Sequence, residues 1–100
     1  MRIKSGKFSV CAEDAEGWPL LEGKGDRCCP GARIRFDEPF ASEPRVHLGI
    51  TEFDILEDSN ARLKVFATEI TNRGFVIHVK TWCDTKVWSV EVDWLAYADE

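Results

Sequence analysis

The sequence predicts an all-β domain built as an antiparallel sandwich or barrel. Turn-forming residues recur at short, regular intervals along the 100-residue chain, and the segments between them have the length of strands. Several of these segments alternate apolar and polar residues with a period of two, the pattern of a strand that is buried on one face. No window shows the sustained apolar spacing of an amphipathic helix, so we expect little helix.

The first third of the chain is its least regular part. We expect a strand over residues 2–10 and a short one over residues 32–36, and the stretch between them, residues 11–31, reads as a loop. Loops of this length in a compact domain are usually functional or held by a covalent link. Four later segments alternate clearly and complete a count of six strands: residues 45–50, 62–67, 75–82 and 89–94.

Length and charge limit the class of protein. One hundred residues are the usual size of one domain, so we expect a single domain over residues 1–100. The chain has 13 basic and 18 acidic residues, a formal net charge of −5 and no basic stripe, so no nucleic-acid partner is expected. No apolar run reaches the roughly 18–20 residues of a membrane span, so no membrane insertion is expected. The first six residues lack the apolar core of a secretory signal.

The cysteines leave two alternatives open. Cys11, Cys28, Cys29 and Cys83 contain no Cys-x-x-Cys pair, so a metal site has little support and no cofactor is expected. One or two disulfides would form in an oxidising compartment, and otherwise the thiols are free. The adjacent Cys28 and Cys29 cannot easily bond to each other, so Cys11 is the better partner for either.

No catalytic motif is present, and we expect that the chain is not an enzyme. His47 and His78 lie on the outward positions of predicted strands, and neither adjoins a recognisable nucleophile. A glycosidase needs two facing carboxylates, and the acidic residues are scattered over turns and polar faces. A glycoside-active enzyme is the weakest of the alternatives.

Two tryptophans flank a predicted hairpin turn. Trp94 lies on the apolar face of its strand and is expected in the core, whereas Trp82 lies on the polar face and Trp88 comes just after the turn. Exposed tryptophans reduce solubility unless a ligand, a neighbouring protomer or another loop covers them. A sugar would suit them, because a pyranose ring has an apolar face and a rim of hydroxyls that bind carboxylates and arginines. Asp26 and Arg62 offer those groups, although they equally fit a turn aspartate and a solvated strand-end arginine.

Motifs along most of the chain resemble the H-type lectin family, which includes the snail agglutinins and the C-terminal domain of the slime-mould discoidins. The combination of motifs is more specific than any one of them. The matching segments are Pro44-Arg45-Val46-His47-Leu48-Gly49-Ile50-Thr51, Asn60-Ala61-Arg62-Leu63-Lys64-Val65, Gly74-Phe75, Thr81-Trp82-Cys83-Asp84-Thr85-Lys86-Val87-Trp88 and Val92-Asp93-Trp94-Leu95-Ala96.

The resemblance implies a six-stranded antiparallel β-sandwich that forms trimers or dimers of trimers. It implies binding of terminal galactose and N-acetylgalactosamine on cell-surface glycans in shallow clefts between protomers, and hence agglutination or cell adhesion. We accordingly expect a secreted or cell-surface protein, although this chain carries no signal peptide. The sugar-binding residues that the resemblance implies are Gly25, Asp26, Arg62, Trp82, Cys83 and Trp88.

Two of these residues depart from the family pattern. Cys83 stands where the snail agglutinins have a ligand-contacting histidine, and Trp88 stands where they have a tyrosine, so the preferred sugar is expected to differ. The apolar Phe66, Val76 and Leu95 lie on nominally polar faces and are expected in a three-fold interface. The main alternative function is a trimeric structural or attachment module whose tryptophans are buried between subunits.

Overall fold

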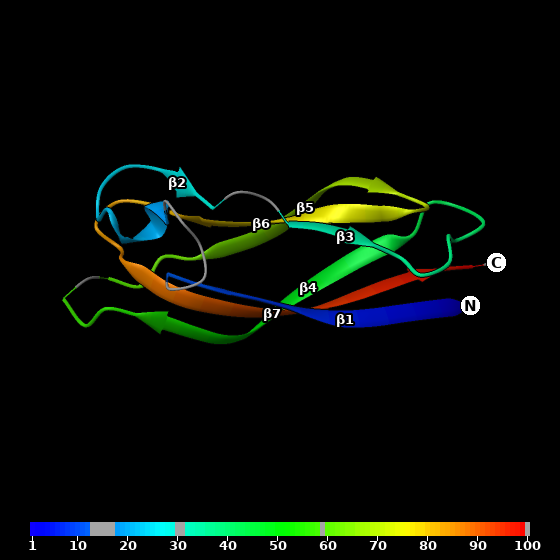
Figure 1. Ribbon diagram of the computed structural model, residues 1–100, viewed down its shortest axis with the longest axis horizontal. Helices are drawn as coiled ribbons and strands as arrows, with labels where there is room; N and C mark the ends of the chain where they lie inside the picture. The colour runs from blue at the N-terminus through cyan, green and yellow to red at the C-terminus, as the bar shows by residue number, and fades with distance from the viewer. Residues whose placement is uncertain (13–17, 30–31, 59, 100) are drawn as a thin grey trace.

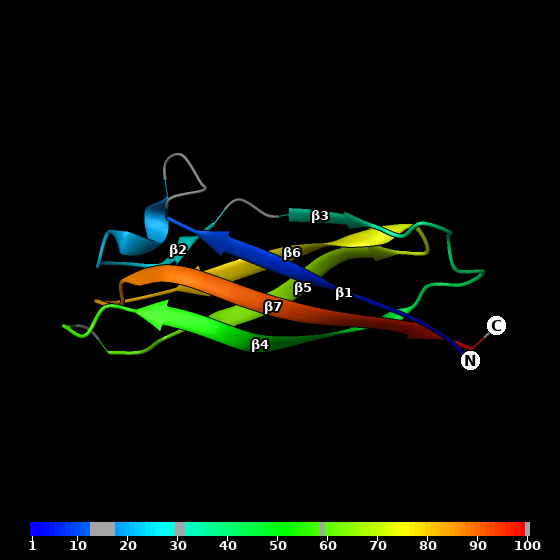
Figure 2. The same ribbon diagram turned by 60° about the horizontal axis from the view of Figure 1, so that its bottom comes forward.

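The computed structural model describes all residues except 13–17, 30–31, 59 and 100. Two antiparallel sheets pack face to face, and Figures 1 and 2 show both layers running along the long axis of the molecule. The molecule is elongated, with extents of 47 × 21 × 21 Å. The expected all-β sandwich is confirmed.

The first sheet has the strand order β1-β7-β4, formed by β1 (Arg2–Cys11), β7 (Val87–Ala98) and β4 (Arg45–Ile55). Most of the alternating apolar residues of the central strand β7 are buried, as the sequence pattern predicts. The pairing of β4 with β7 shifts between Ile50 and Glu52, which marks a β-bulge. The sequence prediction ends this strand at residue 50 because the bulge interrupts the alternation there.

The second sheet is centred on β6 (Gly74–Thr81). β5 (Lys64–Thr71) pairs along one edge of β6, and two short strands, β2 (Arg27–Cys28) and β3 (Ala32–Arg35), pair with the other edge. One turn of 3-10 helix, η1 (Pro19–Leu21), precedes β2. The described residues thus form seven strands, where six are predicted. The additional strand is β2, which lies in the predicted loop and is too short to show alternation.

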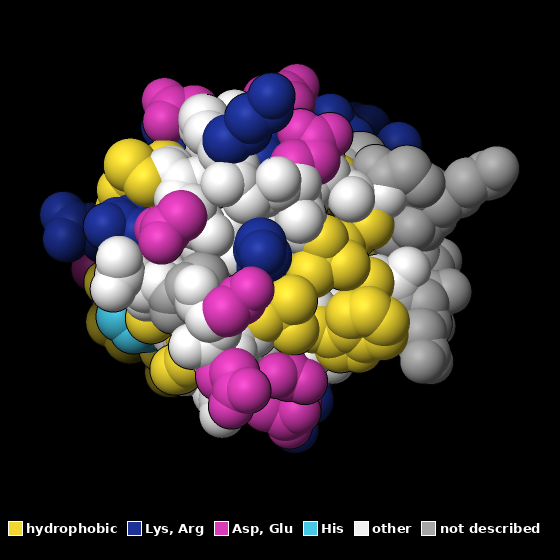
Figure 3. Space-filling model, turned by 90° about the vertical axis from the view of Figure 1, so that its left-hand side faces the viewer, with side chains coloured by type: hydrophobic (Ala, Val, Ile, Leu, Met, Phe, Trp, Pro, Cys, Tyr) yellow, Lys and Arg dark blue, Asp and Glu magenta, His cyan; other side chains and the backbone are white. Residues whose placement is uncertain are grey.

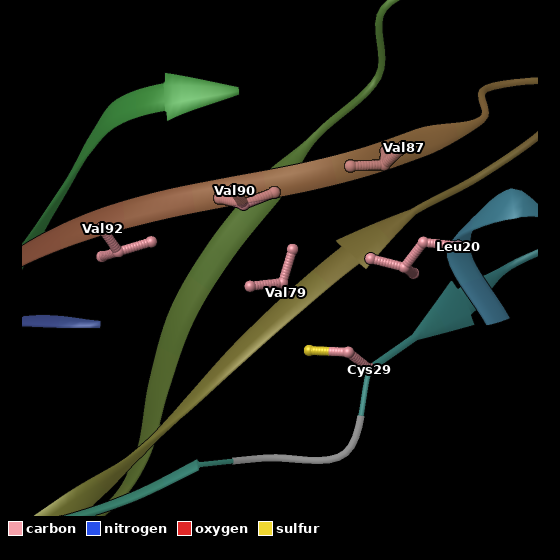
Figure 4. Close-up of a cluster of buried hydrophobic side chains, with 6 residues drawn as sticks. All are labelled: Leu20, Cys29, Val79, Val87, Val90 and Val92. Carbon is pink, nitrogen blue, oxygen red and sulfur yellow. The ribbon is translucent and has the colours of Figure 1, made fainter. Parts of the chain in front are cut away.

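The core between the sheets has two clusters, one toward each end of the sandwich. The first, drawn in Figure 4, consists of Leu20, Cys29, Val79, Val87, Val90 and Val92. The second consists of Phe36, Phe40, Phe75, Ile77, Ala96 and Ala98. The partly buried Phe8 and Leu48 pack against both clusters and connect them. Trp94, which is expected in the core, packs on the second cluster, and Trp18 packs on the first.

All four thiols are free in the structure, in agreement with the second of the two alternatives for the cysteines. Cys29 is buried in the first core cluster, and burial raises the pKa of its thiol. Cys28 and Cys83 are exposed, and Cys11 is half-buried. Cys28 and Cys83 are therefore the thiols most accessible to solvent.

The three residues expected in a subunit interface have different surroundings. Val76 is only 7% exposed within this chain, so it is already covered and the expectation for it is wrong. Phe66 is half-buried and stacks on His78, with 4.9 Å between the ring centroids. Leu95 is 36% exposed and remains available to a partner.

Candidate functional site

One end of the sandwich is formed by three segments that are distant in the sequence. Figure 1 shows them at its left-hand side, where β6 turns into β7. We call this region the Trp82 end. Its first segment is residues 18–27, its second is residues 56–58 and 60–63, on either side of the undescribed residue 59, and its third is residues 82–86.

Buried threonine hydroxyls hold the second segment against the turn. The Thr85 hydroxyl donates to the Asn60 carbonyl at 2.5 Å, and the Thr81 hydroxyl donates to the Arg62 carbonyl. Both threonines are fully buried, and a buried hydroxyl needs such a partner. The backbone around Arg62 is therefore fixed relative to the β6–β7 turn.

The side chain of Arg62 lies beside the same turn and forms an ion pair with Asp84, an interaction that sequence reasoning missed. Burial opposes the charged form of Asp84. Hydrogen bonds from Arg62 and from the backbone of Asp84 and Asn60, together with attraction to Arg62, nevertheless hold the pKa of Asp84 below its ordinary value of 3.8. Asp84 therefore stays ionised at neutral pH and fixes one edge of the guanidinium, whose other N–H groups are left for hydroxyls.

Gly25 and Asp26 lie in the first segment, where Gly25 has a φ of +74°. This left-handed conformation explains the glycine, because other residues adopt it with strain. Asp26 is exposed and its carboxylate lies 3.7 Å from the Lys80 ammonium. Both Asp26 and Arg62 lie at the Trp82 end, but among the described residues no ion pair joins them.

Trp82, Cys83 and Trp88 occupy the turn and the start of β7. Both tryptophans are half-buried, so each keeps part of its ring at the surface. Within the described residues their rings stack neither on each other nor on another aromatic ring. Cys83 is exposed and has a φ of +57°, a conformation that is uncommon outside glycine and often found at functional sites.

None of five surface grooves marks the Trp82 end. These grooves are formed by described residues and have volumes of about 210–410 Å³, and none of the five is lined by Arg62, Trp82 or Trp88. Figure 3 looks onto this end and shows an apolar patch with acidic side chains beside it. Apolar surface next to charged groups suits a ligand that has both an apolar face and hydroxyls.

Arg27 and the buried Thr85 also belong to this end, and the buried Thr81 directly precedes its third segment, although no pattern in the sequence selects these residues. Their positions read as loop or strand-end residues, and only the three-dimensional arrangement shows which backbone groups they bind.

No group of three or more histidine, cysteine or acidic side chains that could hold a metal is found in the described part of the chain. Likewise, none of the described helices is long and apolar enough to cross a bilayer.

Comparison with known sequences gives two related proteins. An open reading frame from the ATP synthase subunits region of Fuscovulum blasticum, ORF 7, is 34% identical over 94 residues, which is 94% of this chain and 81% of that protein. A discoidin-1 polypeptide of Dictyostelium discoideum is 34% identical over 68 residues, which is 67% of this chain but only 27% of the discoidin.

Solved structures give the same relationship. Two structures of Dictyostelium discoideum discoidin II superpose with TM-scores of 0.78 and 0.81, at 25% and 24% identity, over 95% and 99% of this chain. The chain spans only 36% and 37% of those discoidin chains. A Pseudomonas phage tailspike has a TM-score of 0.56 at 14% identity, covers 97% of this chain with 15% of its own, and shares the fold alone. The H-type lectin domain profile matches residues 32–97, so this chain belongs to the H-type lectin family.

Proposed function

We propose that the chain is a carbohydrate-binding lectin domain that recognises terminal galactose or N-acetylgalactosamine on glycans outside the cell. The observation that carries the proposal is the position of the residues that the family resemblance assigns to the sugar. Gly25, Asp26, Arg62, Trp82 and Cys83 come from three distant segments, yet all lie at the Trp82 end, and Trp88 follows on β7.

The chemistry of this end suits a pyranose. The exposed parts of Trp82 and Trp88 offer apolar surface for the C–H face of the ring. Arg62 offers N–H donors for its hydroxyls, and the exposed Asp26 and Asp84 carboxylates offer acceptors. A binding domain of this kind needs no paired catalytic acids, so we expect no hydrolysis of a galactoside.

We expect a neighbouring protomer to complete this site. Three apolar side chains, Ile50, Phe53 and Leu56, are 38%, 56% and 38% exposed, and they lie along and just beyond the half of β4 that leads to the Trp82 end. Burying them in a trimer would place a subunit boundary beside the site. Single sugar sites often bind at about millimolar affinity, and several sites on one assembly add roughly 10²–10⁴ by avidity.

A glycan array followed by isothermal titration tests the proposal. We expect binding to galactose- or N-acetylgalactosamine-terminated glycans, and a loss of affinity of about tenfold or more in Trp82→Ala and Arg62→Ala. Arg73→Ala is the matched control, because Arg73 is an exposed arginine in the β5–β6 turn at the other end.

Absence of binding to any glycan would contradict the proposal. Tryptophan fluorescence then tests the alternative function, a trimeric attachment module in which Trp82 and Trp88 are buried between subunits. In that case dissociation of the oligomer changes the emission, and added sugar does not.

A further inference from the structure

Arg27 is a buried arginine at the centre of the Trp82 end. It is 6% exposed, and no carboxylate among the described residues pairs with it. Its guanidinium instead donates to three backbone carbonyls: Nε to Gly25 at 3.0 Å, Nη1 to Leu20 at 3.1 Å and Nη2 to Cys83 at 2.9 Å. One side chain thus joins the first segment of this end to the β6–β7 turn.

Two of the three carbonyls belong to residues in the left-handed conformation. Gly25 has a φ of +74° and Cys83 a φ of +57°. The cost of a left-handed residue other than glycine must be offset by its surroundings, and a hydrogen bond from a buried guanidinium does so. Arg27 therefore fixes the turn at Cys83 and the loop at Gly25 together.

These bonds also set the direction of the next peptide groups. In a trans peptide the N–H points opposite to the C=O, and no cis peptide is present in the described chain. With the Gly25 and Cys83 carbonyls turned inward to Arg27, the N–H groups of Asp26 and Asp84 are turned away from it. Both aspartates are exposed, so the inward bonds fix the backbone that presents their carboxylates at the surface of this end.

A role in stability alone does not explain an arginine here. Burying a charge is costly, and replacing a buried charge by an apolar residue of similar size is often neutral or stabilising. The planar guanidinium, however, is the side chain that can reach three carbonyls in fixed directions at once.

We propose that Arg27 is a positioning residue for sugar recognition, which holds Asp26 and the Cys83–Asp84 turn in their binding geometry without touching the sugar. This inference rests on the proposed function.

Two variants of Arg27 test it. Arg27→Lys keeps the positive charge but loses the planar guanidinium with its several N–H donors, and Arg27→Met keeps the approximate length without hydrogen bonds. In both variants we expect the affinity for N-acetylgalactosamine to fall about tenfold. Amide exchange in residues 82–86 should become faster in both.

The control variant is Phe40→Leu, which destabilises the core at the other end, where Phe40 is 1% exposed. It should lower the unfolding midpoint and leave sugar affinity and exchange at the turn unchanged. If Arg27→Lys and Arg27→Met bind sugar like the unaltered chain, or lose affinity only in proportion to their folded fraction, the positioning role is wrong.

A measurement on the unaltered chain does not depend on how the variants fold. Adding N-acetylgalactosamine should shift the NMR resonance of the buried Arg27 Nε–H, because the sugar acts on it through Gly25, whose carbonyl accepts from Nε. An unmoved resonance in the sugar-bound protein overturns the inference. If the unaltered chain binds no sugar at all, the proposed function fails, and amide exchange at the turn still decides whether Arg27 holds the two loops together.

Discussion

Asp84 shows how a single residue connects the fold to the candidate site. Its lowered pKa means that the Arg62 pair stabilises the folded state fully above the ordinary value of 3.8, and that this contribution is lost as the pH falls through the lower value of the folded protein. We predict that unfolding by urea at pH 7 and pH 3 shows a smaller loss of stability on acidification in Asp84→Asn than in the unaltered chain. Equal losses in the two proteins would contradict this role of the pair.

Cys83 provides a chemical reporter for the site. Its thiol is exposed, whereas Cys29 is buried and burial raises the pKa of that thiol. We predict that iodoacetamide modifies Cys83 well before Cys29, and that N-acetylgalactosamine slows modification of Cys83. Cys28 is also exposed but is not among the expected sugar-binding residues, so its rate serves as the internal control. Equal effects of the sugar on both thiols would argue against a site at Cys83.

At the level of single residues, the sequence predicted which side chains to examine. It did not predict the hydrogen bonds and ion pairs that connect them. Trp82 could be selected because it breaks the alternation of its strand. Arg27 could not, because an arginine in a glycine-rich loop normally reads as solvated, and its burial depends on carbonyls up to 56 residues away. The ion pair of Arg62 with Asp84 depends in the same way on two segments meeting in space.

Among the elements, the β5–β6 hairpin contains the described glycine with the least room for a side chain, Gly74. A Cβ added at Gly74 would lie 2.0 Å from the Ile34 carbonyl oxygen of the neighbouring strand β3. We predict that Gly74→Ala lowers the free energy of unfolding by about 3 kcal/mol, because backbone must move to make room. Gly49→Ala in β4 is the control, since its Cβ would meet nothing within 4 Å, and we expect a gain of about 0.4–1 kcal/mol there. Chemical denaturation of both variants checks the contrast, and similar effects would contradict it.

The strands themselves could largely be predicted, because period-two alternation reports burial on one face directly. The alternation did not predict β2, which has only two residues, or the part of β4 beyond Ile50, where the bulge shifts the pairing. Both departures lie in elements that lead into the Trp82 end. Local pattern therefore predicts the scaffold better than the segments that form the site.

For the whole molecule, the central expectation is assembly. Phe53 is 56% exposed on β4, and we propose that a neighbouring protomer covers it. Light scattering after size exclusion should give three times, or six times, the chain mass of 11.4 kDa, and Phe53→Asp should give 11.4 kDa because a carboxylate opposes burial. Ser42→Asp, an exposed change at the other end, should leave the assembly intact. A monomeric unaltered chain would rule out a site shared between protomers.

The most direct test of the proposed function is a crystal structure of the chain with N-acetylgalactosamine. We predict one sugar per protomer at the Trp82 end, with its apolar face on a tryptophan ring and its hydroxyls bound to Arg62 and to a carboxylate of Asp26 or Asp84. A sugar bound elsewhere, or none at a concentration that saturates binding in solution, would contradict the assignment of this end as the lectin site.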